Sequence, residues 1–145
     1  MEIAKWMKHP VRSVKPLDSI RHAREMMEEH RINQLPVLVG GRLVGIITDR
    51  DLRDAFPSVL ADPGRRDTPD PQHVTVEAVM TQNVLTLAPT DNMITAASLM
   101  RRERIGAIPI VDGTRLVGML TRSDLLEALV GLDSLVESGR GPGKQ

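Results

Sequence analysis

The sequence repeats itself at an offset of 73 residues, and this repeat constrains the fold more than any other feature. From Met7 onward the repeat has no gap, and it ends in two matching phrases, Gly45-Ile-Ile-Thr-Asp-Arg-Asp-Leu52 and Gly118-Met-Leu-Thr-Arg-Ser-Asp-Leu125. Two copies make a pair rather than a solenoid, which needs about three or more. Because a unit of roughly 50 residues is small for an independent fold, we expect the two copies to pack together as one module.

Hydrophobic periodicity predicts the elements of each copy. In the first copy, a short strand at residues 11–14 is followed by a helix that Asp18 caps and that ends near residues 30–31. Apolar runs at residues 34–39 and 43–47 then predict two strands.

A glycine pair and a proline refine this prediction. Gly40-Gly41 is typical of a tight hairpin turn between the two strands, and Pro36 favours a non-central or bulged position in the first of them. A second helix is expected to begin near Asp49 and to stop at Pro57. The expected fold is therefore α/β (α+β): two β-α-β-β-α repeats packed sheet to sheet about a pseudo-twofold axis.

The domain boundaries follow from composition. Residues 1–56 form the first repeat, and residues 57–73, rich in Pro, Asp and Gly, form a linker. The second repeat covers residues 74–136, of which residues 74–79 are a short helical or extended approach. Residues 137–145 are expected to be a flexible tail.

Charge and residue usage exclude several functions. Nineteen basic residues balance nineteen acidic ones, there is no cysteine, and Trp6 and Phe56 are the only aromatic residues, so neither nucleic acid nor thiolate chemistry is favoured. No apolar run approaches the roughly 18 residues of a membrane span. We expect a soluble, cytoplasmic protein without a membrane partner. The four histidines lack a carboxylate at metal spacing and no nucleophile–base pair is recognisable, so we predict neither a metal site nor an enzyme.

The repeated Thr-x-x-Asp has two interpretations. In the first it is a capping box, in which Thr48 or Thr121 caps a helix and Asp51 or Asp124 reaches back to a free amide. In the second, the same helix start binds an anion or a phosphate, and the aspartate accepts hydrogen bonds from the two hydroxyls of a ribose. The two interpretations use the same geometry, and the phrase alone does not decide between them.

The full pattern resembles a known family. The tandem elements, the strands Leu35-Pro-Val-Leu-Val39 and Ile108-Pro-Ile-Val-Asp112, and the Gly-h-h-Thr-x-x-Asp-Leu endings are similar to the cystathionine-β-synthase (CBS) domain pair, or Bateman module, over residues 7–130. The resemblance implies a stand-alone module that senses AMP, ADP, ATP or S-adenosylmethionine in clefts between its two repeats. No other cofactor is implied.

The resemblance also implies roles for individual residues. Asp51 and Asp124 would hold ribose hydroxyls, Thr48 and Thr121 would face ribose or phosphate, and the second residue after each threonine would touch phosphate; these last are Arg50 and Ser123. The adenine pocket with Asp51 would consist of Asn83, Val84, Ile105 and Gly106, and that with Asp124 of Pro10, Val11, Ile32 and Asn33.

The two copies differ just after the threonine, with Asp49-Arg50 in one and Arg122-Ser123 in the other. Because a carboxylate near the phosphates repels them, we expect the Asp124 site to prefer di- or triphosphates and the Asp51 site to prefer AMP or no ligand. The predicted function is a non-catalytic sensor that dimerises through its helices and acts on an unidentified protein. The alternative is a ligand-independent interaction or oligomerisation module in which both Thr-x-x-Asp corners are only caps.

Overall fold

The chain divides into two compact units, which we name after the aspartates they contain. In the computed structural model, the Asp51 unit comprises Val11–Leu85 and Gly113–Leu116, and the Asp124 unit comprises Met1–Pro10, Thr86–Asp112 and Val117–Gln145. The structure describes residues 1–55 and 70–140, and within the last helix the side chains up to residue 136. Phe56, the expected helix stop at Pro57, most of the predicted linker and residues 141–145 of the predicted tail lie outside the described residues.

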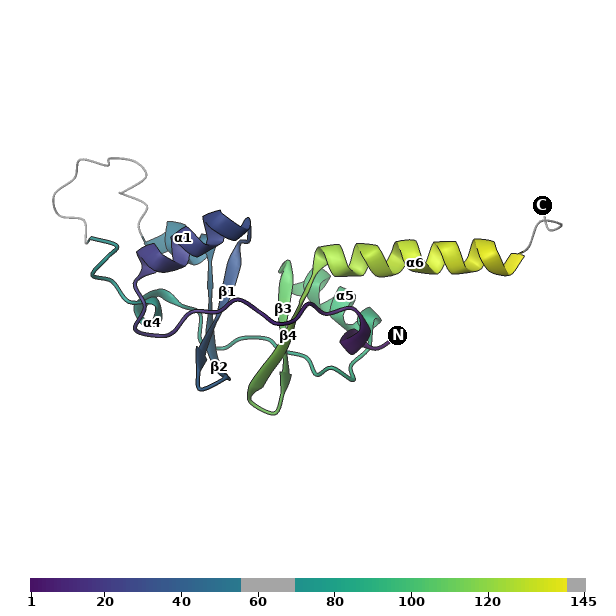
Figure 1. Ribbon diagram of the computed structural model, residues 1–145, viewed down its shortest axis with the longest axis horizontal. Coiled ribbons are helices and arrows are strands. Elements are labelled where there is room, and N and C mark those ends of the chain that lie inside the picture. Colours follow the sequence, from purple (N-terminus) through teal and green to yellow (C-terminus); the bar gives the residue numbers. More distant parts are fainter. Residues whose placement is uncertain (56–69, 141–145) are drawn as a thin grey trace. The chain divides into compact units, whose positions relative to one another are not determined.

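The Asp51 unit contains the elements predicted for the first repeat, except the first strand (Figure 1). They are α1 (Ile20–His30), β1 (Gln34–Val39), β2 (Arg42–Thr48) and α2 (Asp49–Ala55), followed by α4 (Val76–Val79) from the approach to the second repeat. α1 ends at Arg31, whose left-handed φ of 54° turns the chain toward β1.

The Asp124 unit contains the equivalent elements of the second repeat and the N-terminal segment. They are η1 (Ile3–Lys5), α5 (Met93–Glu103), β3 (Ala107–Asp112), β4 (Arg115–Thr121) and α6 (Arg122–Arg140). The first residues of β4 belong to the Asp51 unit, where Arg115 pairs with Arg42 of β2. α6 continues four residues beyond the expected end at Val136, so the predicted tail begins as helix.

β1 and β2 form the predicted antiparallel hairpin. Gly40 and Gly41 make its turn with φ values of +56° and +82°, which glycine adopts without steric cost. The strand register shifts between Val37 and Leu38, one residue after Pro36, which is where the sequence favours a bulge. β3 and β4 are hydrogen-bonded neighbours in the same way.

Two details of the first repeat differ from the prediction. Residues 11–14 do not form a strand; Val14 alone makes a parallel bridge with Val37 of β1. Asp18 is not the cap of α1, because Ser19 Oγ accepts the His22 N–H at 3.1 Å.

Asp18 instead closes the turn before the helix, where its carboxylate accepts the Lys15 N–H at 2.8 Å. The second repeat has the same arrangement, with an aspartate that closes the turn and the next residue as the helix cap. Asn92 caps α5 by accepting the Ile94 N–H at 2.8 Å, and Asp91 accepts the Ala88 N–H at 2.7 Å. In both repeats the residue after the repeated aspartate is therefore the cap.

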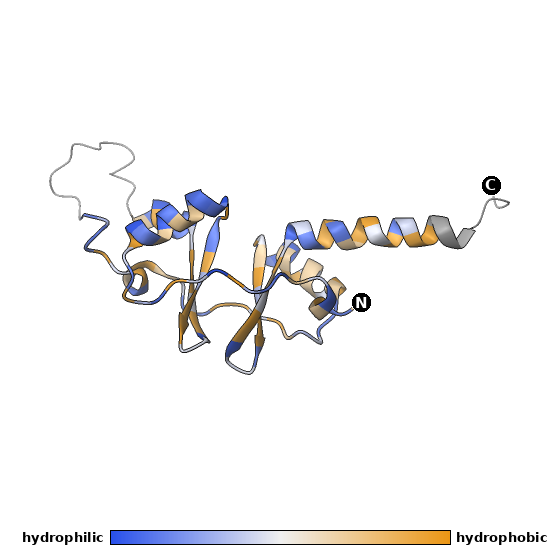
Figure 2. Cartoon of the chain, in the orientation of Figure 1, coloured by the Kyte–Doolittle hydropathy of each residue, from blue (hydrophilic) through white to orange (hydrophobic). Residues whose placement is uncertain are grey.

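Each unit has its own buried apolar core. The strands that contribute to these cores have hydrophobic stretches, drawn in orange in Figure 2. The core of the Asp51 unit consists of Val14, Ile20, Ala23, Met27, Leu35, Val37, Ile47 and Val76. The core of the Asp124 unit consists of Ile3, Met93, Ala96, Met100, Ile108, Ile110, Leu120 and Ala128. Ile3 and Val76 occupy equivalent positions of the repeat, and each is fully buried in the core built around the other copy's strands. The segment that precedes each repeat thus contributes a buried side chain to the core of the other repeat.

A membrane crossing would need a longer run of apolar helix than any found in the two described ranges.

Candidate functional site: two Thr-x-x-Asp corners

Each corner is built from a strand end, a helix start and a segment that arrives from the other repeat. In the Asp51 unit, Thr81 exchanges two backbone hydrogen bonds with Ile46 of β2, at 2.8 and 2.9 Å. In the Asp124 unit, Lys8 exchanges two with Met119 of β4, at 2.9 and 3.0 Å. Both pairs obey the 73-residue offset, so Lys8 and Thr81 occupy equivalent positions beside the two corners.

The glycine that opens each phrase makes room for this segment. A Cβ on Gly45 would lie 2.5 Å from the sulfur of Met80 and 3.0 Å from the carbonyl oxygen of Thr81. A Cβ on Gly118 would lie 2.5 Å from the sulfur of Met7 and 3.2 Å from the carbonyl oxygen of Lys8. The glycines therefore have a structural role, which is to let the crossing backbone approach the strand.

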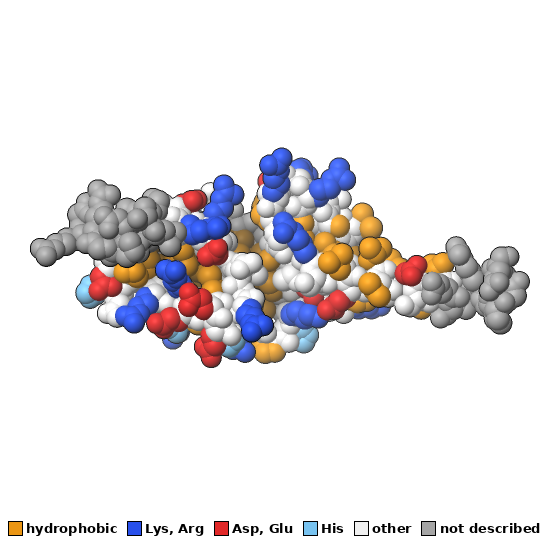
Figure 3. All heavy atoms as spheres, turned by 90° about the horizontal axis from the view of Figure 1, so that it is seen from above, with side chains coloured by type: hydrophobic (Ala, Val, Ile, Leu, Met, Phe, Trp, Pro, Cys, Tyr) orange, Lys and Arg blue, Asp and Glu red, His pale blue; other side chains and the backbone are white. Residues whose placement is uncertain are grey.

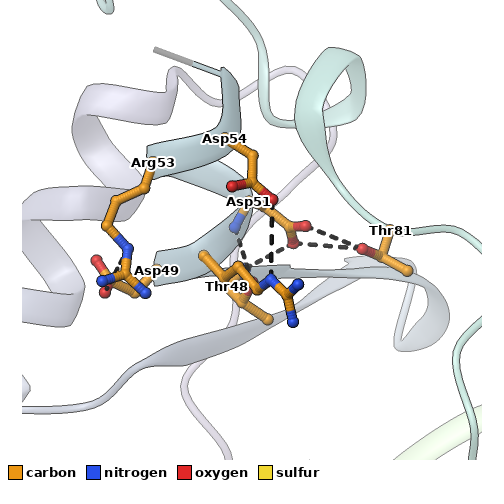
Figure 4. A network of polar contacts seen from close by, with 7 residues as sticks. Thr48, Asp49, Asp51, Arg53, Asp54 and Thr81 are labelled. Carbon is orange, nitrogen blue, oxygen red and sulfur yellow. Dashed lines mark hydrogen bonds and ion pairs between the residues drawn. The ribbon is translucent and has the colours of Figure 1, made fainter. Parts of the chain in front are cut away.

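The Asp51 corner forms a complete capping box (Figure 4). Thr48 N–H donates to Asp51 Oδ2 at 2.9 Å, and Asp51 N–H donates to Thr48 Oγ1 at 3.0 Å. The Thr81 hydroxyl reaches both carboxylate oxygens, at 3.1 and 3.3 Å. The Asp51 carboxylate is partly exposed, with hydrogen-bond donors on both oxygens.

The Asp124 corner uses the same residues differently. Thr121 donates both its N–H, at 2.8 Å, and its hydroxyl, at 3.1 Å, to Oδ2 of Asp124. Asp124 is fully buried, and its other oxygen, Oδ1, has no hydrogen-bond donor among the described residues. Lys8 Nζ lies 3.4 Å from Oδ1, close enough for ion pairing but without hydrogen-bond geometry.

Lys8 lies between two carboxylates. Its Nζ is 3.3 Å from Glu127 Oε2, and its side chain is 63% exposed. The hydrogen bond to Glu127, and next the close contact with Asp124 and its charge, raise the pKa of Lys8 above its ordinary value of 10.5. The ammonium group therefore stays charged at neutral pH beside the buried carboxylate.

Lys8 is the functional candidate that sequence reasoning missed. Its partner Glu127 is 119 residues away, so no local pattern connects them. The available signal was the repeat itself, in which the equivalent position is Lys8 in one copy and Thr81 in the other.

The structure distributes the predicted site residues over both units. Thr48, Arg50, Asp51, Asn83 and Val84 belong to the Asp51 unit, as do Val11, Ile32 and Asn33, which the resemblance groups with Asp124. Pro10, Thr121, Ser123 and Asp124 belong to the Asp124 unit, as do Ile105 and Gly106, which the resemblance groups with Asp51. The two predicted residue groups therefore do not coincide with the two units.

Asp49 faces away from the Asp51 carboxylate. Its carboxylate pairs with Arg53 at 3.5 Å, on another side of α2 from Asp51 (Figure 4), and its N–H donates to the Asn33 carbonyl at 2.8 Å. A surface pocket of about 360 Å³ has Ile32, Asn33 and Asp49 among its lining residues.

Arg122, the equivalent residue, is placed in the same way. Its N–H donates to the Gly106 carbonyl at 3.1 Å, and its guanidinium carbon would lie 3.4 Å from a Cβ on Gly106. Asp49 and Arg122, which differ in charge at the same position of the two phrases, thus border Asn33 and Gly106 rather than their own aspartates. The predicted phosphate preference cannot be assigned from the phrase alone, because the resemblance places Asn33 and Gly106 in the opposite sites.

The chemistry available at the corners is hydrogen bonding. Within residues 1–55 and 70–140, no three His, Cys, Asp or Glu side chains gather closely enough to hold a metal ion. A buried carboxylate oxygen without a donor, at a helix start, is suited to a ligand that brings hydroxyl groups.

Comparison with known proteins identifies the family. The family model for the CBS domain matches residues 2–58 and again residues 76–131. The chain belongs to the CBS domain family. A CBS domain-containing protein of Dictyostelium discoideum is 39% identical over 111 residues, which are 74% of this chain and 77% of that protein. The CBS repeats confirm the tandem mixed helix-and-sheet fold.

Two solved structures of CBS proteins contain adenosine compounds. The CBS domain pair of protein MJ0100, in complex with 5′-methylthioadenosine and S-adenosyl-L-methionine, is 28% identical with a TM-score of 0.72, covering 91% of this chain and 98% of that one. CBSX2 in complex with AMP is 25% identical with a TM-score of 0.77, with the same coverage of both chains.

Enzymes match this CBS chain over a small part of their length. A homoserine O-acetyltransferase of Methanocorpusculum labreanum is 36% identical over 115 residues, which are 78% of this chain but 21% of the enzyme.

Proposed function

We propose that this CBS domain pair is a non-catalytic regulatory module that binds adenosine-containing ligands at its two Thr-x-x-Asp corners. AMP, ADP, ATP and S-adenosylmethionine are the candidate effectors, in clefts between the two repeats. Ligand binding would change the equilibrium between two states of the module by no more than its difference in affinity for them, and an unidentified cytoplasmic protein would respond to that change.

The observation that carries this proposal is the carboxylate of Asp124. The side chain is fully buried, and Oδ1 lacks a hydrogen-bond donor among the described residues. Leaving a buried polar atom without a partner costs about 1–3 kcal/mol, so the site favours a ligand that supplies donors. The two hydroxyls of a ribose are such donors, and the relatives solved with adenosine compounds support this ligand class.

A thermal shift experiment tests the proposal. A ligand that binds only the folded protein raises the melting temperature, and at 100 times Kd it adds about 2.7 kcal/mol to the free energy of unfolding. We expect a rise with at least one of AMP, ADP, ATP and S-adenosylmethionine. Adenine, which lacks the ribose, is the control and should give no rise. No rise with any adenosine compound would contradict the proposal.

The alternative, a ligand-independent interaction module, is favoured by one observation at the other corner. Thr48 and Asp51 satisfy each other's amides completely, so this corner is stable as a cap without any ligand. Under the alternative, oligomeric state and stability would not respond to adenosine compounds at either corner.

We also infer that the protein is a homodimer whose subunits pack through α6. Six large apolar side chains of this helix are 45–70% exposed: Leu126, Leu129, Val130, Leu132, Leu135 and Val136. Hydrophobic segments recur along α6 in Figure 2, and Figure 3 shows hydrophobic side chains exposed on the surface of the molecule. Packing this helix against its copy would bury on the order of 1,000 Å², the lower range of specific interfaces, in the isologous manner of most dimers.

Light scattering after size exclusion tests the dimer. Leu129→Glu should give a monomer, because a charge at the interface opposes association. Leu17→Glu, at a side chain that is 75% exposed outside α6, is the matched control and should leave a dimer. A monomeric wild-type protein at micromolar concentration would contradict the dimer.

A further inference from the structure

The two corners differ in charge through a residue that neither Thr-x-x-Asp phrase contains. At the Asp51 corner the crossing segment places the neutral hydroxyl of Thr81 3.1 Å from Asp51 Oδ1. At the Asp124 corner it places the ammonium of Lys8 3.4 Å from Asp124 Oδ1. We propose that Lys8 makes the Asp124 corner select anionic adenosine ligands, the nucleotide phosphates, over uncharged adenosine and the cationic sulfonium of S-adenosylmethionine. This inference rests on the proposed function.

Lys8 places a positive charge directly beside the carboxylate of its corner. Its Nζ lies 3.4 Å from Asp124 Oδ1 and 3.3 Å from Glu127 Oε2. At the Asp51 corner the equivalent residue, Thr81, contacts the carboxylate with an uncharged hydroxyl. An anionic ligand that contacts the Asp124 carboxylate therefore meets a cation that the other corner lacks at this position.

The equivalent carboxylates show why the cation matters. Asp54 and Glu127 occupy the same position in the two helices. Arg50 pairs with Asp54 along the exposed surface of α2, at 3.8 Å, with both side chains at least 75% exposed. Ser123 replaces that arginine in α6, and Lys8 pairs with Glu127 instead, so that the cation stands beside the buried aspartate.

Lys8 does not need to leave when a ribose binds. Because its Nζ already contacts Glu127 at 3.3 Å, it can keep that partner while the hydroxyls of the ligand take Asp124 Oδ1. Its side chain is 63% exposed and can follow the phosphates by rotamer change. The ammonium then compensates both the carboxylate and the ligand phosphates.

The test is a comparison of Lys8→Thr, which installs the residue of the other repeat, with Lys5→Thr, which removes the same charge in η1. Trp6 is the only tryptophan of the chain and lies two residues from Lys8, so its fluorescence reports titrations at this corner. AMP, ATP, adenosine and S-adenosylmethionine are titrated at low and high salt, and calorimetry with the Asp51→Asn variant confirms which corner is read.

We expect Lys8→Thr to weaken AMP and ATP binding by at least about fivefold at low salt, because each unit charge at 6–8 Å in water-like surroundings changes affinity about two- to threefold. Adenosine should change by less than about twofold, S-adenosylmethionine should bind no worse, and high salt should reduce the effect. Lys5→Thr should change none of the four affinities by more than about twofold.

Two results would overturn the inference. If Lys8→Thr changed the affinities for charged and uncharged ligands equally, or changed none of them, Lys8 would not select ligands by charge. Binding by the wild-type protein would still support the proposed function in that case. No binding of any of the four compounds to the wild-type protein would overturn the proposed function and, with it, the inference.

Discussion

Thr121 donates both its backbone N–H and its hydroxyl to one oxygen of Asp124, whereas Thr48 uses its hydroxyl to accept the amide of Asp51. The same two residue types therefore exchange hydrogen bonds in one repeat, whereas in the other both hydrogen bonds run from the threonine to the aspartate. In the first case the threonine stabilises the helix, and in the second it satisfies half of a buried carboxylate. This difference leads to separate expectations for the two threonines.

Thr48→Ala should lower the free energy of unfolding by about 1 kcal/mol, because the substitution removes the cap of α2. Chemical denaturation measures the change. Thr114→Ala, at an exposed threonine in the turn before β4, is the control and should stay within about 0.5 kcal/mol of wild type. A loss at Thr48 no greater than at Thr114 would show that the cap contributes nothing.

Asp124→Ala should destabilise the protein by about 2–3 kcal/mol, because the N–H and hydroxyl of Thr121 lose their acceptor in a buried place. Asp124→Asn keeps an acceptor there and should cost less. The two variants are compared by urea denaturation, with the m-value as a check that the folded state is unchanged. Equal stability of the alanine variant and wild type would contradict the buried, hydrogen-bonded placement of Asp124.

Gly45→Ala should cost about 1–3 kcal/mol, because its Cβ would lie 3.0 Å from the Thr81 carbonyl oxygen as well as against the Met80 sulfur. The flexible methionine can move, but the hydrogen-bonded backbone of Thr81 cannot do so cheaply. Gly131→Ala in α6 is the contrast. Its Cβ would meet Trp6 at 3.4 Å, so the better helix propensity of alanine should stabilise the protein, by up to about 1 kcal/mol.

Thermal and chemical denaturation of both glycine variants would give opposite signs. If Gly45→Ala left the free energy of unfolding unchanged, the crossing segment would not pack closely against β2 at Gly45. A destabilising Gly131→Ala would mean that Trp6 cannot accommodate the extra methyl group.

The stabilising contribution of Lys8 should not depend on pH in the neutral range. Its partners raise its pKa in the folded state above 10.5, so the contribution is fully present below about 10.5 and is lost as the pH rises through the folded value. The difference in unfolding free energy between wild type and Lys8→Thr should therefore be flat between about pH 6 and 9 and narrow above about pH 10.5. A difference that changed near pH 7 would assign the effect to another group.

The sequence predicted the repeated parts of the fold because local physics determines them. The glycine pair at Gly40-Gly41 determines the hairpin turn, and the predicted end of the first helix near residues 30–31 agrees with the last residue of α1, His30. The choice between Asp18 and Ser19 as the cap depends on one residue of register. Both are good caps, and only the turn at Lys15, which uses the Asp18 carboxylate, decides between them.

The corners could be predicted only in part, because their third component comes from distant sequence. Thr-x-x-Asp is visible locally, but the segments that carry Lys8 and Thr81 reach the corners through strand bridges to Met119 and Ile46. The sequence comparison of Asp49 with Arg122 therefore selected residues that border Asn33 and Gly106. The difference between the corners at the carboxylates themselves lies in the crossing residue.

Calorimetric titration of AMP and ATP into wild type, Asp51→Asn, Asp124→Asn and the double variant tests the central claim most directly. Asparagine keeps an acceptor for each threonine amide, so the caps and the fold are retained, while the carboxylate that would hold the ribose hydroxyls is removed. We predict that the wild type binds at both corners, that each single variant loses one of the two binding events, and that the double variant binds neither nucleotide. Undiminished binding to the double variant would contradict the account.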